Sequence, residues 1–226
     1  MYHLLLKFII FFITIFLSSK YRSAISQSIK LIDYPDKRKD HRLPTPLIGG
    51  LISVILITEY LITNNYTKSD ILIIDGTSAG GLLIAGCMTM RPELYKIVIA
   101  DVPFVDVLNT MADPRISLTT FEWKECGNPN KQKYYDSILE YSPYNNIKKV
   151  NYPNCLFLTS LNDNRVGYWE PLKFIAKLRN YCTDTNIHLL YCNTDGGHFP
   201  SSDKYDYLNN YIYTYAFIIK LLHIII

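Results

Sequence analysis

Charged residues are scarce in this 226-residue sequence, where they make up 19% of the chain and leave a net charge of only +3. So small an excess of positive charge, with no basic stripe interleaved with aromatic residues, argues against a nucleic-acid partner. A composition of 49% hydrophobic residues also excludes a disordered chain. At this length we expect one good hydrophobic core rather than two full domains.

Paired cysteine motifs and internal repeats are absent too. The five cysteines contain no Cys-x-x-Cys pair, and their number is odd. This spacing predicts neither a zinc site nor a disulfide framework, and we expect buried free thiols instead. The cysteines are Cys87, Cys126, Cys155, Cys182 and Cys192. The sequence therefore predicts no metal and no cofactor.

The amino-terminal stretch, residues 1–18, is almost wholly apolar, unlike the rest of the chain. Residues 1–18 are interrupted chiefly by His3 and Lys7, and basic residues follow up to Arg42. An apolar run of this length with a basic flank predicts a membrane helix or uncleaved anchor, with the remainder of the chain in the cytoplasm. A second apolar run, 47–57, is short for a span and predicts a core helix or half of a membrane hairpin.

From residue 58 onward, strand-like and helix-like patterns alternate along the sequence, as in βαβ units. Continuous apolar runs are typical of strands buried in a parallel sheet. Such runs occupy 71–75, 95–100, 155–161 and 187–193, and helical patterns occupy 79–90, 168–181 and 205–222. The helix at 168–181 is expected to bury Leu172, Ile175 and Leu178.

These elements predict an α/β fold of the hydrolase type, truncated to a parallel sheet of about four strands. One or two apolar, membrane-type helices are expected to precede it. We divide the chain into an amino-terminal membrane-type segment with a basic loop (1–57) and a partial hydrolase domain (58–226).

The segment Gly76-Thr77-Ser78-Ala79-Gly80 follows the first of these apolar runs. It fits the G-x-S-x-G nucleophile elbow, a sharp turn between a strand and a helix that exposes the serine hydroxyl. The glycines are expected to leave room for the turn. The backbone N–H of Ala79, at the head of the helix, is the expected oxyanion donor, and a second donor is expected from a loop upstream of the elbow.

A serine nucleophile needs a base and an orienting carboxylate. Of the histidines, His198 is the expected base, because it follows a strand and a Gly-Gly loop that can present its ring. His188 lies within a strand and is expected in the core or at an edge. His3 and His41 lie outside the hydrolase-like part, and His223 lies in the terminal apolar helix.

Asp163 follows another strand and is the expected orienting carboxylate. Asp184, in a loop far from a strand end, and Asp195, close to His198 in sequence, are its competitors. The order Ser78, Asp163, His198 is that of the α/β-hydrolases.

With these residues identified, the region from about 59 to 220 resembles the carboxy-terminal part of the oligopeptidase B branch of the prolyl oligopeptidase family of serine peptidases. The resemblance rests on GTSAGGLLIAG (76–86), RPELYKIVIADVPFVDVLNTM (91–111), ECGNP (125–129), YSPYNNI (141–147), LNDNRVGYWEPLKFIAKLR (161–179) and GGH (196–198). It implies a serine endopeptidase for short peptides and the same three catalytic residues.

The resemblance also implies a substrate-binding acid at Glu122, which would recognise a basic residue before the scissile bond. Lys124 stands where a second acid is expected, and its charge would repel such a substrate. The β-propeller, the first sheet strands and an oxyanion tyrosine of that family are not recognisable here, so impaired turnover is expected.

Residues 1–57 contain Leu31-Ile32-Asp33-Tyr34-Pro35-Asp36-Lys37-Arg38-Lys39-Asp40-His41 and Pro46-Leu47-Ile48-Gly49-Gly50. This pattern is similar to the first cytoplasmic loop of the polyprenyl-phosphate sugar-1-phosphate transferases.

Two interpretations therefore remain beside an active peptidase. One is a non-catalytic, membrane-anchored remnant or gene fusion that retains the triad. The other is an interaction protein of the cell envelope.

Overall fold

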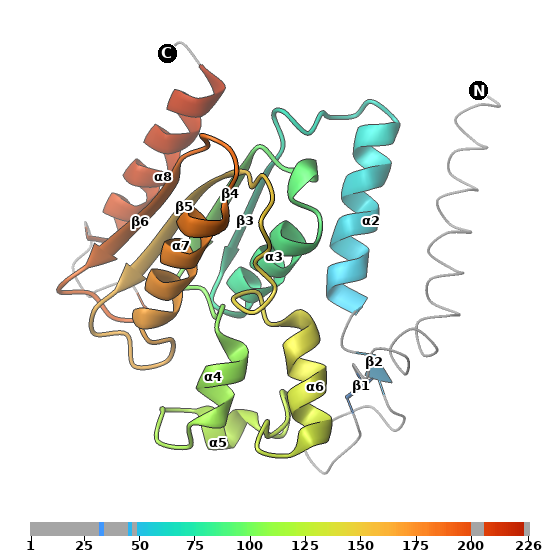
Figure 1. The fold of residues 1–226 in the computed structure, drawn as a ribbon. Helices are drawn as coiled ribbons and strands as arrows, with labels where there is room; N and C mark the ends of the chain where they lie inside the picture. Colours follow the sequence, from blue (N-terminus) through green and yellow to red (C-terminus); the bar gives the residue numbers. More distant parts are fainter. Residues whose placement is uncertain (1–31, 34–44, 47–48, 200–205, 224–226) are drawn as a thin grey trace.

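The computed structural model describes residues 32–33, 45–46, 49–199 and 206–223. Within this part of the chain, the main sheet is parallel and has the strand order β3-β4-β5-β6 (Figure 1). Its strands are β3 (Ile73–Thr77), β4 (Ile97–Asp101), β5 (Asn154–Ser160) and β6 (His188–Asn193). The predicted α/β fold with a four-stranded parallel sheet is thus confirmed.

The sheet is most deeply buried at β5, where all seven residues are buried. That strand lies between β4 and β6, so both of its backbone edges are hydrogen-bonded, and helices cover both of its faces. By contrast β3 is an edge strand within the described residues, and its Asp75 and Thr77 are exposed. Burial therefore falls from the middle of the sheet toward the strand that leads into the elbow.

Helices cover both faces of the sheet. On one face α3 (Ala79–Met90) and α7 (Trp169–Tyr181) pack on the strands around Phe157, whose ring stacks on that of Phe174 at 5.1 Å. On the other face α8 (Asp206–Leu222) buries Phe217 against apolar residues of β4 and β5. The result is a three-layer α/β arrangement, which Figure 1 shows with α8 at the β6 side.

The buried stripe of α7 differs from the predicted one. Ile175 and Leu178 are buried as expected, but Leu172 is 47% exposed. The stripe instead continues through Pro171 and Phe174. Positions 171, 174, 175 and 178 follow the i, i+3, i+4, i+7 spacing of one helix face, and residue 172 lies a third of a turn away.

The second apolar run forms part of α2 (Gly49–Thr63), which packs on α3. A Cβ atom on Gly86 of α3 would lie 2.8 Å from the side chain of Leu51, and Arg91 forms an ion pair with Glu59. The core-helix interpretation of this run therefore holds. Among the residues that the structure describes, no helix is both long and apolar enough to cross a membrane. The membrane-type character expected for this second helix is therefore not found.

The other predicted membrane helix, residues 1–18, lies outside the described residues. So does most of the segment that resembles the transferases, apart from the two-residue antiparallel strands β1 (Ile32–Asp33) and β2 (Thr45–Pro46) and the start of α2. The division at residues 57 and 58 falls inside α2 and stays a prediction.

Three short helices lie beyond the carboxyl ends of the strands, at the bottom of Figure 1. They are α4 (Val107–Ala112), α5 (Thr119–Glu122) and α6 (Gln132–Tyr141). A separate apolar cluster holds α4 to α6 through Met111 and Ile138. A single-turn 3₁₀ helix (Pro92–Leu94) connects α3 to β4.

Candidate active site

Ser78 lies at the sharp turn between β3 and α3. Its backbone has φ 56° and ψ −116°, a region that residues other than glycine rarely adopt. The turn is held by its neighbours, since Ser78 N–H donates to the Asp101 carbonyl at 2.9 Å and Phe104 N–H donates to the Ser78 carbonyl at 3.2 Å. Such strain persists where surrounding contacts over-determine it, as at a nucleophile elbow.

Two glycines make this turn possible. A Cβ atom on Gly76 would lie 2.5 Å from the carbonyl oxygen of Gly80, and one on Gly81 would lie 2.4 Å from Cβ of Pro103. Gly80 was expected to provide room as well, but a Cβ there would meet no described atom within 4 Å. The second close approach is therefore made by Gly81, where α3 passes over the turn that follows β4.

The structure brings the three predicted side chains of the triad together. His198 Nε2 lies 3.1 Å from Ser78 Oγ, and His198 Nδ1 lies 2.8 Å from Asp163 Oδ2. Because an ionised carboxylate only accepts hydrogen bonds, Nδ1–H donates to Asp163 and Nε2 is left to accept from the serine hydroxyl. The order of contacts is the one that nucleophile activation requires.

Asp163 is fixed by the chain around it. Its Oδ1 accepts hydrogen bonds from Arg165 N–H at 2.8 Å and from Val166 N–H at 2.9 Å, which leaves Oδ2 directed at His198. Its side chain is fully buried in this contact, and that of His198 is 6% exposed. The carboxylate therefore has little freedom to leave the imidazole.

The loop that carries His198 is shaped by Asn193, the last residue of β6. Its Oδ1 accepts from the N–H groups of Asp195 and Gly196 at 3.0 and 3.2 Å. Asn162 N–H then donates to the Gly196 carbonyl at 3.1 Å and joins the Asp163 and His198 loops. The side chains of the triad thus follow β3, β5 and β6 at one edge of the sheet, where the carboxyl ends of parallel strands meet.

Among the described residues, the other histidines and the two competing aspartates are not members of the triad. His188 is buried at the start of β6, and Asp184 lies in the turn that precedes it, so both are at the opposite edge of the sheet. Asp195 is exposed on the His198 loop, where its N–H bonds Asn193. His223 follows α8 at the carboxyl end, whereas His3 and His41 lie outside the described residues.

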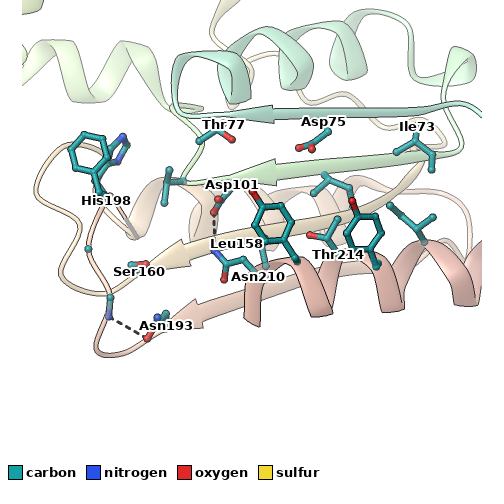
Figure 2. A pocket seen from close by; sticks show the side chains of 18 residues that line it. Ile73, Asp75, Thr77, Asp101, Leu158, Ser160, Asn193, His198, Asn210 and Thr214 are labelled. Carbon is teal, nitrogen blue, oxygen red and sulfur yellow. Dashed lines mark hydrogen bonds between the residues drawn. The ribbon is translucent and has the colours of Figure 1, made fainter. Parts of the chain in front are cut away.

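A hollow of about 270 Å³ lies between the sheet, α8 and the His198 loop (Figure 2). Asp75 and Asp101 project into it from neighbouring strands, and Asn210 of α8 lies 3.5 Å from Asp101. Burial raises the pKa of Asp101, and the charge of Asp75 raises it further, while Asn210 and His198 act in the opposite direction.

Asp101 directly follows the predicted strand at 95–100, and the sequence predicted no role for it. Its position was a usable signal, because Asp101 ends β4 at the same edge as the triad. The next residue, Val102, has φ 40°, an outlier for a β-branched side chain. A second strained residue therefore lies in the turn that packs against the elbow.

A larger and more open hollow, of about 720 Å³, lies on the other side of Asp163. Arg115, Arg165 and Trp169 contribute to its lining. Glu122, the substrate-binding acid expected from the resemblance, ends α5 and lines neither of these two hollows. The structure therefore places Glu122 near the carboxyl ends of the strands but outside the lining of both hollows.

Glu170, in the first turn of α7, ties this helix to the segment after β4. It is fully buried, and its Oε2 accepts from the N–H groups of Val105 and Asp106 at 3.0 and 2.8 Å. Its Oε1 accepts from the Thr110 hydroxyl at 2.7 Å. Burial raises the pKa of Glu170 to about 7, against the lowering effect of these hydrogen bonds.

A parallel sheet that presents a serine on a strained strand-to-helix turn, with an aspartate and a histidine after two later strands, defines the α/β-hydrolase class. The family within this class follows from sequence. The profile of the prolyl oligopeptidase family matches residues 53–224, and the chain belongs to that family. The resemblance found from the motifs is thereby confirmed.

Individual relatives agree with this assignment. Protease 2 of Moraxella lacunata is 43% identical over 168 residues, and dipeptidyl aminopeptidase BI of Pseudoxanthomonas mexicana is 40% identical over 175 residues. These matches cover 74% and 77% of this chain but 24% of each relative. Oligopeptidase B from Leishmania major superimposes with a TM-score of 0.76 at 44% identity, over 78% of this chain and 24% of that one. The chain thus spans about a quarter of the length of these proteins.

Proposed function

We propose that the chain is a serine peptidase that cleaves peptide bonds through an acyl-enzyme formed on Ser78. The observation that carries the proposal is the hydrogen-bonded series Ser78, His198, Asp163, with distances of 3.1 and 2.8 Å. Both distances lie within the reach needed for proton transfer and for orientation of the base. Membership of the prolyl oligopeptidase family supports the same chemistry.

In the proposed reaction, Ser78 Oγ attacks the carbonyl carbon of the scissile bond while its proton passes to His198 Nε2. Asp163 holds the imidazole through Nδ1 and stabilises the imidazolium that results. His198 then returns the proton to the leaving amine, and the acyl-enzyme forms. A water molecule, deprotonated by the same nitrogen, releases the acid product and restores Ser78.

Negative charge develops on the carbonyl oxygen during both attacks. Ala79 is the first residue of α3, so its N–H has no acceptor within the helix and heads the positive end of the helix dipole. We assign Ala79 N–H as the backbone oxyanion donor. One such donor typically contributes about 10²–10³ in rate.

Short peptides are the substrate class that we propose. Relatives carry the names protease, dipeptidyl aminopeptidase and oligopeptidase B, which all denote action on peptides. We also propose a preference for a basic residue before the scissile bond, through Glu122, which the charge of exposed Lys124 two positions away would reduce. Substrates that differ only in Arg, Ala or Glu before the scissile bond would measure this preference.

A fluorophosphonate probe tests the proposal, since it reacts with activated serines only. The full chain should be labelled at Ser78, and Ser78→Ala should abolish the labelling. A peptide substrate should then be cleaved by the wild type and not by Ser78→Ala. A folded chain that stays unlabelled would refute the enzyme and favour the interpretation that the triad is a non-catalytic remnant.

A further inference from the structure

A second cluster of reactive side chains lies at the opposite edge of the sheet from the triad. Cys182 follows the last residue of α7, Asp184 lies in the next turn, and His188 begins β6. One thiol sulfur, one carboxylate oxygen and one imidazole nitrogen all lie within 4.8 Å of one another. The strand β6 places this cluster roughly 17 Å from the end that carries the His198 loop.

The spacing of these atoms is close to that of a metal site. Cys182 Sγ lies 3.0 Å from Asp184 Oδ1 and 3.9 Å from His188 Nε2. Bond lengths of about 2.3 Å to sulfur and 2.0–2.2 Å to nitrogen or oxygen put the ligand atoms of a tetrahedral zinc ion about 3.6 Å apart. The third separation, between Asp184 and His188, is at most 4.8 Å, so changes of roughly 1.2 Å or less in these separations would accommodate the ion.

The oxygen and nitrogen ligands, Asp184 and His188, are already oriented by the surrounding chain. Asp184 Oδ2 accepts from Tyr152 N–H at 2.9 Å, and Oδ1 accepts from Asn186 N–H at 2.8 Å. His188 is only 7% exposed, so the surrounding chain restricts the orientation of its ring.

The charges also balance. A thiolate, a carboxylate and a neutral imidazole carry two negative charges, which a divalent cation would neutralise in this partly buried place. Cys182 and Asp184 are half-buried, so an ion could enter from solvent.

A nucleophilic role for Cys182 fits the geometry less well. Asp184 contacts the thiol rather than the imidazole, so it does not orient His188 as a base.

We propose that Cys182, Asp184 and His188 form a zinc site that links the end of α7 to the start of β6. The ion forms one bond each to sulfur, oxygen and nitrogen, and the thiol proton passes to solvent. The fourth position of the tetrahedron is left for water, as in sites with three protein ligands.

The test uses Zn²⁺, and Co²⁺ as its coloured substitute, added to the full chain after chelator treatment. We expect one equivalent of Zn²⁺ to bind with micromolar or tighter affinity and to raise the melting temperature. Co²⁺ should give the ultraviolet charge-transfer absorption of a thiolate ligand. Cys182→Ser and His188→Gln should each weaken binding about tenfold or more.

The matched control is Cys192→Ser, because Cys192 is a half-buried thiol on the same strand, four residues beyond His188. It should retain the full equivalent of zinc. On the wild type, Zn²⁺ should also slow the alkylation of Cys182 by iodoacetamide without slowing that of Cys192. This second measurement needs no variant to fold.

Absence of stoichiometric binding to the folded chain would overturn the zinc site. So would binding that survives both ligand substitutions, or equal protection of Cys182 and Cys192. Fluorophosphonate labelling of Ser78 is read separately, so failure of one proposal is distinguishable from failure of the other.

Discussion

Pro103 lies so close to Gly81 that no side chain fits between them, since a Cβ atom on Gly81 would be 2.4 Å from Cβ of Pro103. Gly81→Ala should therefore push α3 away from the turn after β4 and displace Ser78. We expect a loss of fluorophosphonate labelling by at least about 10²-fold, because misplacement of a reacting group by about 1 Å can have that effect. Labelling rate, with circular dichroism as a check on folding, measures it.

The control lies one residue earlier. Gly80→Ala adds the same methyl group to the same helix, where no described atom is within 4 Å. Alanine is the better helix former by about 1 kcal/mol, so stability should hold or rise and labelling should persist. Equal damage from both substitutions would contradict the packing argument.

Asp163→Asn should spare the fold but disable the base. The Asp163 carboxylate receives three hydrogen bonds, from His198 and from two backbone N–H groups. An amide must present N–H₂ to one of these donors, which favours the wrong imidazole tautomer. The expected fall in kcat for a peptide substrate is about 10⁴-fold, the size of the effect of that substitution in other serine peptidases. Asp195→Asn, on the same loop as His198, should leave kcat unchanged.

Glu170 should make stability depend on pH near neutrality. Its pKa is about 7 in the folded protein against 4.5 for an ordinary glutamate. The unfolded chain therefore releases this proton first, and the free energy of unfolding should fall as pH rises from 4.5 to 7. The linkage amounts to roughly 3 kcal/mol. Denaturant titrations at pH 5 and pH 8 would measure it.

Glu170→Gln should flatten this dependence. The amide oxygen can accept from Val105 and Asp106, and the amide N–H₂ can donate to the Thr110 hydroxyl, which is able to accept. Glu125→Gln serves as the control, since Glu125 is an exposed carboxylate and should leave the pH dependence intact. A slope that Glu170→Gln does not alter would assign the effect to another group.

Two apolar residues on α7, Ile175 and Leu172, offer a test of core packing. Ile175 is 1% exposed and Leu172 is 47% exposed. Ile175→Ala should reduce the free energy of unfolding by about 2–5 kcal/mol, because it leaves a cavity beneath the helix. Leu172→Ala should change it by about 0.5 kcal/mol or less. Comparable losses at both positions would mean that Leu172 contacts something outside the described residues.

The sheet was predictable because its strands contain apolar runs, which are buried most completely in the central strands β4 and β5. The predicted strand at 155–161 is observed at 154–160, one residue earlier. The buried face of α7 was harder to predict, since Leu172 is as apolar as Ile175 and Leu178. Only the position of the sheet decides which of them is buried.

The triad could be predicted because each of its members lies in the turn or loop that follows a strand, and parallel strands end at one edge. What the sequence did not disclose depends on contacts between distant segments. The role of Gly81 requires knowledge that Pro103 lies against it, and the place of Asp101 beside the His198 loop depends on the position of that loop over the sheet. The Cys182 cluster escaped a search for Cys-x-x-Cys pairs because its ligands are of three chemical kinds.

The strand that leads to the nucleophile is one of the two edge strands of the sheet. Within the described residues β3 is hydrogen-bonded along one edge only, to β4, and β6 likewise only to β5, whereas β4 and β5 each have two neighbours. Local opening costs least where few buried contacts must break, so β3 and the elbow should exchange their amide hydrogens sooner than β5. Mild heating or a low concentration of denaturant should then abolish the reactivity of Ser78 while most of the secondary structure persists. Loss of activity would thus report a partial opening and not the global unfolding of the protein.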